Sequence, residues 1–155
     1  MINDEKAKSA NESFYEAFNK RDIEAMQQVW GEGGKETCVH PGWPPLIGFD
    51  AILNSWAGIF ENSGNMDIRI SDVRVVASAD LAWVSCTEKL FTIAESGVLV
   101  SQVCATNLFG VEGDVWKMIM HHASPFPANL TLSPLSTPAG TETEISLLIS
   151  IAPLP

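Results

Sequence analysis

The chain has 155 residues, of which 46% are hydrophobic and 18% charged. This composition fits one globular domain with a sizeable core and excludes a disordered chain. The 19 acidic and 9 basic residues give a net charge of −10. Nucleic acids and anionic membrane surfaces both attract basic patches, so neither is an expected partner.

The N-terminal segment lacks the apolar stretch of a secretory signal, and no apolar run is long enough to span a bilayer. The three cysteines, Cys38, Cys86 and Cys104, are odd in number and lack metal-ligand spacing. We therefore expect reduced cysteines in a cytoplasmic protein with no cofactor and no metal.

The first sixty residues predict three helices. Phe14 and Phe18 share the apolar stripe of the first helix, which Asn3 or Asp4 can cap. A short second helix follows the capping residue Asp22 and carries an apolar side that ends near Trp30. Residues 49–62 predict the third helix, with Trp56 on its apolar stripe.

The strands are predicted from apolar residues that recur at every second position. Residues 37–40 read as one short strand before Pro41. Four longer strands with short hairpin connections are predicted at residues 66–78, 81–94, 98–111 and 115–124. The predicted fold is α+β, with three N-terminal helices packed on one face of a curved antiparallel sheet.

Residues 1–125 are interpreted as this domain, and residues 126–155 as a tail rich in proline, serine and threonine without lysine or arginine. The tail is expected to be partly extended. Its segment 145–151 is apolar and strongly β-prone, so we expect it to dock on a sheet edge or a neighbouring subunit.

His40 is the main candidate for chemistry. It ends the short strand and precedes a stiff loop that contains three prolines and Trp43. A histidine held at a strand end by a rigid loop suits a base or a polar anchor in a pocket; anchoring of the loop is the alternative. Cys38 shares its strand face, but two ligands alone make a poor metal site.

Two further polar positions belong to the last strands. His121 and His122 are adjacent and must point to opposite faces, and we expect His121 on the pocket side. The apolar residues Trp116, Met118 and Met120 would then form an outer face suited to a homodimer. Asn107 is unusual inside a strand, which suggests a hydrogen-bonding role in the pocket.

The ordered motifs resemble those of the SnoaL-like proteins, within the nuclear transport factor two-like superfamily. The motifs are Phe14-Tyr15-x-Ala17-Phe18, Val39-His40-Pro41-Gly42-Trp43, Ala105-Thr106-Asn107 and His121-His122-Ala123-Ser124-Pro125. The resemblance implies a cone-shaped fold of the ketosteroid isomerase type, a pocket between helices and sheet, and a dimer. It fixes no single chemistry.

Two relatives within that superfamily give opposite expectations. Compared with ketosteroid isomerase, the general-base aspartate falls on His40 and the oxyanion tyrosine on Phe14, so a base is retained and a phenolic donor is missing. The kinase association domains have a Cys-Asp-Pro-Gly stretch similar to the one around His40, which implies a non-catalytic assembly module.

The first hypothesis is a SnoaL-like protein that binds or transforms a small apolar or amphipathic organic molecule. If it is an enzyme, it would be a cofactor-independent isomerase, cyclase or hydratase-type protein with His40 as the candidate catalytic residue. The predicted pocket residues are Phe14, Phe18, Trp30, Trp43, Trp56, Asn107 and His121. The second hypothesis is a dimerisation or assembly module.

Overall fold

The structure is a computed structural model and describes residues 2–64, 66–95 and 97–126. The expected tail from residue 126 onward, with its segment 145–151, lies outside these residues apart from Phe126. No helix in the described part is both long and apolar enough to cross a membrane.

Three helices precede the long strands, as the sequence predicts. The helices are α1 (Ile2–Lys20), α2 (Ile23–Val29) and α3 (Phe49–Asn62). The strands are β1 (Thr37–Val39), β2 (Leu46–Ile47), β3 (Met66–Ala77), β4 (Leu81–Ala94), β5 (Gly97–Glu112) and β6 (Val115–Pro125). The sequence did not predict β2, which is only two residues long.

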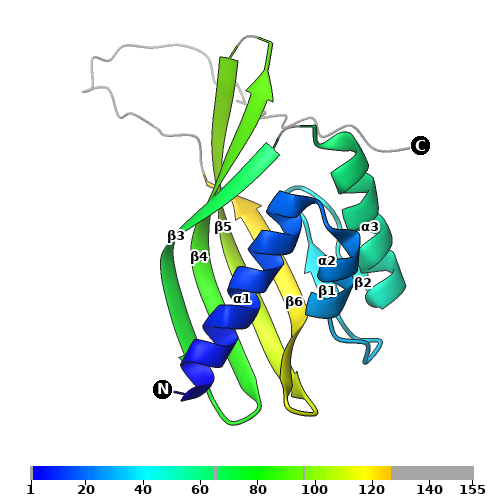
Figure 1. The fold of residues 1–155 in the computed structure, drawn as a ribbon, viewed down its shortest axis with the longest axis vertical. Coiled ribbons are helices and arrows are strands. Elements are labelled where there is room, and N and C mark those ends of the chain that lie inside the picture. Colours follow the sequence, from blue (N-terminus) through cyan, green and yellow to red (C-terminus); the bar gives the residue numbers. More distant parts are fainter. Residues whose placement is uncertain (1, 65, 96, 127–155) are drawn as a thin grey trace, which may run out of the picture.

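The strands form one curved six-stranded sheet in the order β2-β1-β6-β5-β4-β3. Adjacent strands are antiparallel, except that β1 and β6 run parallel to each other. In this parallel pair, Cys38 on β1 lies opposite His121 on β6. In Figure 1, α1 crosses the sheet while α2 and α3 lie beside β1 and β6. The predicted α+β class, with three helices on a curved sheet, is confirmed.

The turns around α2 and α3 have clear local causes. The Asp22 side chain accepts a hydrogen bond of 2.9 Å from the Ala25 backbone N–H and so caps α2. Gly48 precedes α3 with a φ of 90°, which a residue with a β-carbon rarely adopts. Its N–H donates to the Glu36 carbonyl, which ties the start of α3 to the chain just before β1.

A β-bulge corrects the expected faces of β6. Leu108 pairs with Met120 but Phe109 pairs with Met118, so Ile119 has no partner in the register. The extra residue shifts the alternation of side chains by one position, so Met118 faces the helix-covered side of the sheet. Trp116 and Met118 are consequently buried in the core, and the expectation that they line the outer face is wrong.

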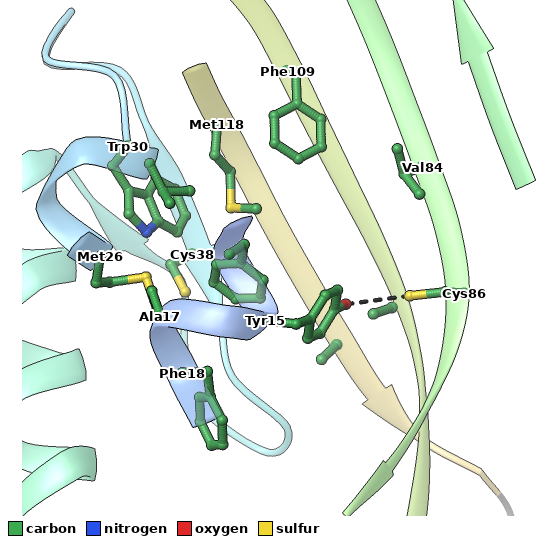
Figure 2. Close-up of a cluster of buried hydrophobic side chains, with 14 of the residues drawn as sticks. Tyr15, Ala17, Phe18, Met26, Trp30, Cys38, Val84, Cys86, Phe109 and Met118 are labelled. Atoms are coloured by element: carbon green, nitrogen blue, oxygen red, sulfur yellow. Dashed lines mark hydrogen bonds between the residues drawn. The ribbon is translucent and has the colours of Figure 1, made fainter. Parts of the chain in front are cut away.

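The core lies between α1 and the inner face of β4, β5 and β6. Figure 2 shows side chains from α1, α2 and the sheet converging there, with Tyr15 reaching from α1 toward Cys86 on β4. The largest fully buried side chains include Trp30, Phe14 and Phe109. The inner face of the sheet is therefore filled at one end, and its other end borders a cavity described next.

Candidate functional site

A cavity of about 370 Å³ lies between the helices and the inner face of the sheet. Aromatic side chains make up much of its wall: Phe14, Phe18, Trp43 and Trp56. Three ionisable side chains also line it, namely His40, Glu88 and His121. This mixture of a mostly apolar wall with a few polar groups is typical of sites for small organic ligands.

His40 follows β1 directly and is held by a serine of α3. Its Nε2 lies 2.9 Å from Ser55 Oγ, which itself donates to the Ile52 carbonyl at 2.7 Å. Because the serine proton is used by that carbonyl, His40 Nε2–H must donate to Ser55 and the lone pair resides on Nδ1. The edges of Trp43 and Trp56 pack around the imidazole.

Burial keeps this imidazole neutral. His40 is 3% exposed, and burial lowers its pKa to about 4. Cys38 Sγ lies 3.8 Å from both ring nitrogens, a distance that allows a weak hydrogen bond from the thiol to the lone pair on Nδ1. Burial raises the pKa of the Cys38 thiol far above its usual range, so Cys38 and His40 form no thiolate–imidazolium pair.

His121 on β6 is the second imidazole of the wall, and a hydrogen-bond chain fixes its tautomer. Asn107 Nδ2 donates to Asn11 Oδ1 at 2.8 Å and to the Tyr15 hydroxyl at 3.1 Å. Asn107 Oδ1 is therefore an acceptor, and it lies 2.7 Å from His121 Nδ1. His121 must carry its proton on Nδ1, which leaves the lone pair on Nε2.

No side chain in the described part of the protein hydrogen-bonds His121 Nε2. Burial, with smaller contributions from His40 and His122, lowers the pKa of His121 to about 3. The His121 ring lies 5.0 Å from the Phe14 ring and 6.5 Å from the His40 ring, measured between centroids. His121 is thus a neutral base whose unshared electron pair is free of protein partners.

Glu88 on β4 is the group that sequence reasoning missed. Beside Lys89 it reads as half of a solvated pair, yet it is 3% exposed and accepts a 2.7 Å hydrogen bond from the Tyr15 hydroxyl. Burial raises the pKa of Glu88 to about 7, with the Tyr15 hydrogen bond acting in the opposite direction. The sequence does contain one signal of this burial. Glu88 alternates in step with Val84 and Cys86, which face inward, so the period of the strand places it on the same face.

The structure brings most of the predicted pocket residues together. Phe14, Phe18, Trp43, Trp56, His40 and His121 all line the cavity. Asn107 lies behind His121 rather than in the wall, and it acts through the hydrogen bond described above. Trp30 is fully buried away from the cavity and bridges to Met118 on β6.

The arrangement can move a proton on a bound ligand. It combines two neutral imidazoles with a carboxyl group that titrates near neutral pH, all in an apolar wall. General acid–base catalysis is most efficient when the pKa of the group lies near the working pH, a condition that Glu88 meets, while the two imidazoles are present as neutral bases. Among the described residues, no group of three or more histidine, cysteine or acidic side chains is placed to hold a metal ion.

Sequence comparison identifies the family. Residues 7–129 match the model of the SnoaL-like domain. The chain is also 27% identical over 116 residues to the F-box protein SKIP8 of Arabidopsis thaliana. That match covers 75% of this chain and 48% of the plant protein, so the chain spans about half the length of this curated relative.

Solved structures give the same result for the fold. A candidate dehydratase of the NTF2-like family from Streptomyces avermitilis is 34% identical, with a TM-score of 0.75 over 82% of this chain and 99% of that one. A candidate calcium/calmodulin-dependent protein kinase type II association domain from Thiobacillus denitrificans is 31% identical. Its TM-score is 0.70 over 77% of this chain and 94% of that one. Together with the cavity-bearing cone of helices and sheet, these matches show that the chain belongs to the SnoaL-like family of the NTF2-like superfamily.

Proposed function

We propose that the cavity binds a small apolar or amphipathic organic molecule and transfers a proton on it without a cofactor. His121 Nε2 serves as the base, and His40 serves as a polar wall group that holds the ligand. The observation that carries this proposal is the burial of two neutral imidazoles in the wall of one aromatic cavity of about 370 Å³.

The hydrogen bonds support different roles for His40 and His121. Ser55 and its helix hold His40 in one orientation, which suits a positioning role. His121 is oriented from behind by Asn107, so its lone pair stays on Nε2, the nitrogen that no described residue hydrogen-bonds. A base oriented by a hydrogen bond to its other nitrogen is a common arrangement in general base catalysis.

The relative described as a candidate dehydratase supports a reaction of the hydratase or isomerase type. In such reactions a base removes a proton from a carbon next to a carbonyl group. A neutral imidazole in a water-poor cavity can do this at neutral pH without first losing a proton of its own. We therefore infer that the substrate is a small molecule with an acidic C–H bond.

Proton exchange on a model ketone tests this function. β-Tetralone has an apolar body and acidic C–H bonds, and its exchange with deuterium oxide can be followed by proton NMR. We expect the protein to accelerate exchange and His121→Ala to reduce the acceleration by at least about tenfold. We expect His40→Ala to weaken it as well while the fold is retained.

The adjacent histidine provides a matched control. His122 is exposed on the opposite face of β6, so His122→Ala should leave exchange unchanged. Equal rates in the His121→Ala and His122→Ala variants, with both variants folded, would contradict the proposal. Absence of acceleration by the unmodified protein would also contradict proton transfer.

A second candidate function is assembly, and one observation favours it. Val76, Trp83, Leu108 and Met120 lie in register across the outer face of four strands, with Trp83 44% exposed and Val76 45% exposed. An apolar row of this kind suits a homodimer interface, and a relative is described as an association domain.

Sedimentation velocity tests the assembly candidate. We expect a dimer in the unmodified protein and a monomer in Trp83→Arg, because a charge would be buried in the proposed interface. Arg74→Ala, next to the same row but outside the apolar stripe, is the control and should stay dimeric. A monomer in the unmodified protein would contradict this candidate.

A further inference from the structure

Glu88 has one carboxylate oxygen that no protein group uses. Tyr15 donates to Oε1 at 2.7 Å, and no other described residue hydrogen-bonds the carboxyl group. The side chain is 3% exposed and lines the cavity. Oε2 is open to the cavity, where a ligand or a water molecule can hydrogen-bond it, so it marks a binding position.

The cavity around this position contains no cation. The described residues of its wall include no lysine or arginine, and the ion pairs Lys20–Glu16 and Arg69–Asp67 are exposed and do not involve Glu88. The remaining polar groups of the wall are uncharged: the amide and hydroxyl side chains of Asn62, Ser63, Thr92 and Ser101, and the indole N–H groups of Trp43 and Trp56. A negatively charged ligand would therefore enter without a counter-charge.

His121 and the ionised form of Glu88 face the cavity with acceptor atoms that no described residue hydrogen-bonds, whereas Cys38 Sγ is within hydrogen-bonding reach of the His40 nitrogens. His121 Nε2 offers a lone pair, because its other nitrogen carries the proton. The ionised form of Glu88 offers Oε2. A ligand that satisfies them must bring hydrogen-bond donors in an otherwise apolar body, as alcohols and phenols do.

We propose that Glu88 Oε2 binds the hydroxyl group of a small, neutral, largely apolar alcohol or phenol, and that the cavity discriminates against carboxylates. This inference rests on the proposed function, since it names the chemical class that the same cavity selects. It assigns Glu88 as a ligand-contacting residue in addition to His121 and His40.

Three probes with the same bicyclic body test the selectivity: naphthalene, β-naphthol and β-naphthoate. Binding is measured by fluorescence or calorimetry at about pH 8, above the pKa of Glu88 and below that of a phenol. We expect β-naphthol to bind about tenfold more tightly than naphthalene, as one hydrogen bond to a charged acceptor allows. β-Naphthoate should bind at least about tenfold more weakly than β-naphthol.

The variant Glu88→Gln keeps the shape of the side chain and replaces its ionisable carboxyl group with a neutral amide. Tyr15 can still donate to the amide oxygen, which turns the amide N–H₂ toward the cavity and replaces an acceptor with a donor. We expect the preference for β-naphthol to disappear and the binding of β-naphthoate to improve. Glu61→Gln, at an exposed position near the end of α3, is the matched control and should change nothing.

Proton-dependent binding gives a second test that needs no variant. Glu88 is approached by Tyr15 from α1, by Cys86 on its own strand and by Cys38 from β1, while the two imidazoles share the cavity wall. The pKa values of Tyr15 and the two thiols are raised and those of the imidazoles are lowered, so Glu88 alone of this group titrates near pH 7. The preference for β-naphthol over naphthalene should therefore grow between about pH 6 and pH 8.

The outcomes separate this inference from the proposed function. If naphthalene binds in the cavity but β-naphthol gains nothing over it at any pH, the role of Glu88 is overturned and the ligand-binding cavity stands. If no probe binds, both proposals fail. Persistence of the β-naphthol preference in a folded Glu88→Gln variant would also overturn the assignment of Glu88.

Discussion

His121 and His122 are neighbours in the chain, yet they lie in opposite environments on the two faces of one sheet. His121 points to the helix-covered face, where it is 3% exposed and bound to Asn107. His122 lies on the outer face in register with Thr106, and it is exposed. The comparison shows that strand parity, and not residue type, decides which histidine can take part in chemistry.

The largest effect should come from a deletion that reverses which side chains of a strand face the core. Deleting Thr106 from β5 would turn Asn107 outward and place its neighbours on the wrong faces, so we expect no folded protein. Deleting Ile119 removes only the unpaired residue of the bulge and keeps Met118 and His121 on the inner face, so we expect a folded domain. Circular dichroism and thermal unfolding distinguish the two deletions; equal losses would contradict the bulge.

The bulge also shows where sequence reasoning reaches its limit. Helical spacing and alternating strands predict the α+β fold, because burial imposes those two periods on the sequence. A bulge breaks the alternation at one residue without leaving a glycine or proline as a signal. Trp116 and Met118 were therefore assigned to the outer face, although His121, beyond the bulge, was assigned to the inner one.

The same limit of sequence reasoning applies to the residues of the candidate site. A histidine between a strand and a proline-rich loop is distinctive in the sequence, and the role of His40 as a base or polar anchor stays a prediction. Glu88 was missed because a charged residue beside a lysine is usually solvated. Its burial depends on Tyr15, which comes from a helix 73 positions away in the chain. The strand parity that Glu88 shares with Val84 and Cys86 is a local signal of its inward position, but the contact with Tyr15 leaves no local pattern in the sequence.

Two tryptophans offer the next comparison between the faces. Trp30 is completely buried under α2, whereas Trp83 is 44% exposed on the outer face. We expect Trp30→Ala to lower the free energy of unfolding by about 3–5 kcal/mol, because a large cavity would remain. Trp83→Ala should cost less than about 1 kcal/mol. Urea unfolding checks both values, and a larger loss for Trp83→Ala would contradict the assignment of faces or indicate a buried dimer contact.

The inner face should also give the protein an unusual dependence of stability on pH. Glu88 has its pKa raised from 4.5 to about 7 on folding, so the folded state binds more protons between these values. Its contribution to stability is therefore present below about pH 4.5 and is lost as the pH rises through about 7, by on the order of 3 kcal/mol in total.

The two buried imidazoles act in the opposite direction. Their pKa values fall from 6.5 to about 4 for His40 and about 3 for His121, so the unfolded state binds more protons below pH 6.5. Their contribution is present above the unfolded value and is lost on acidification. The two imidazoles outweigh Glu88 between about pH 4.5 and 6.5, so the midpoint of thermal unfolding should rise over this range and level off near pH 7. Glu88→Gln removes the opposing contribution and should steepen the rise; an unchanged slope in a folded variant would contradict the raised pKa of Glu88.

The smallest expected effect concerns the hydrogen bond that holds His40. Ser55→Ala removes the acceptor of His40 Nε2–H and leaves that donor in a buried wall, which should cost about 1–2 kcal/mol. Ser85→Ala, on the outer face of β4, loses no described hydrogen bond and should cost less than about 0.5 kcal/mol. Nitrogen NMR of the imidazole adds a readout beyond stability, because His40 without Ser55 is free to move its proton to Nδ1. If its tautomer and its contribution to β-tetralone exchange stay unchanged in Ser55→Ala, the aromatic edges of Trp43 and Trp56 alone orient the ring.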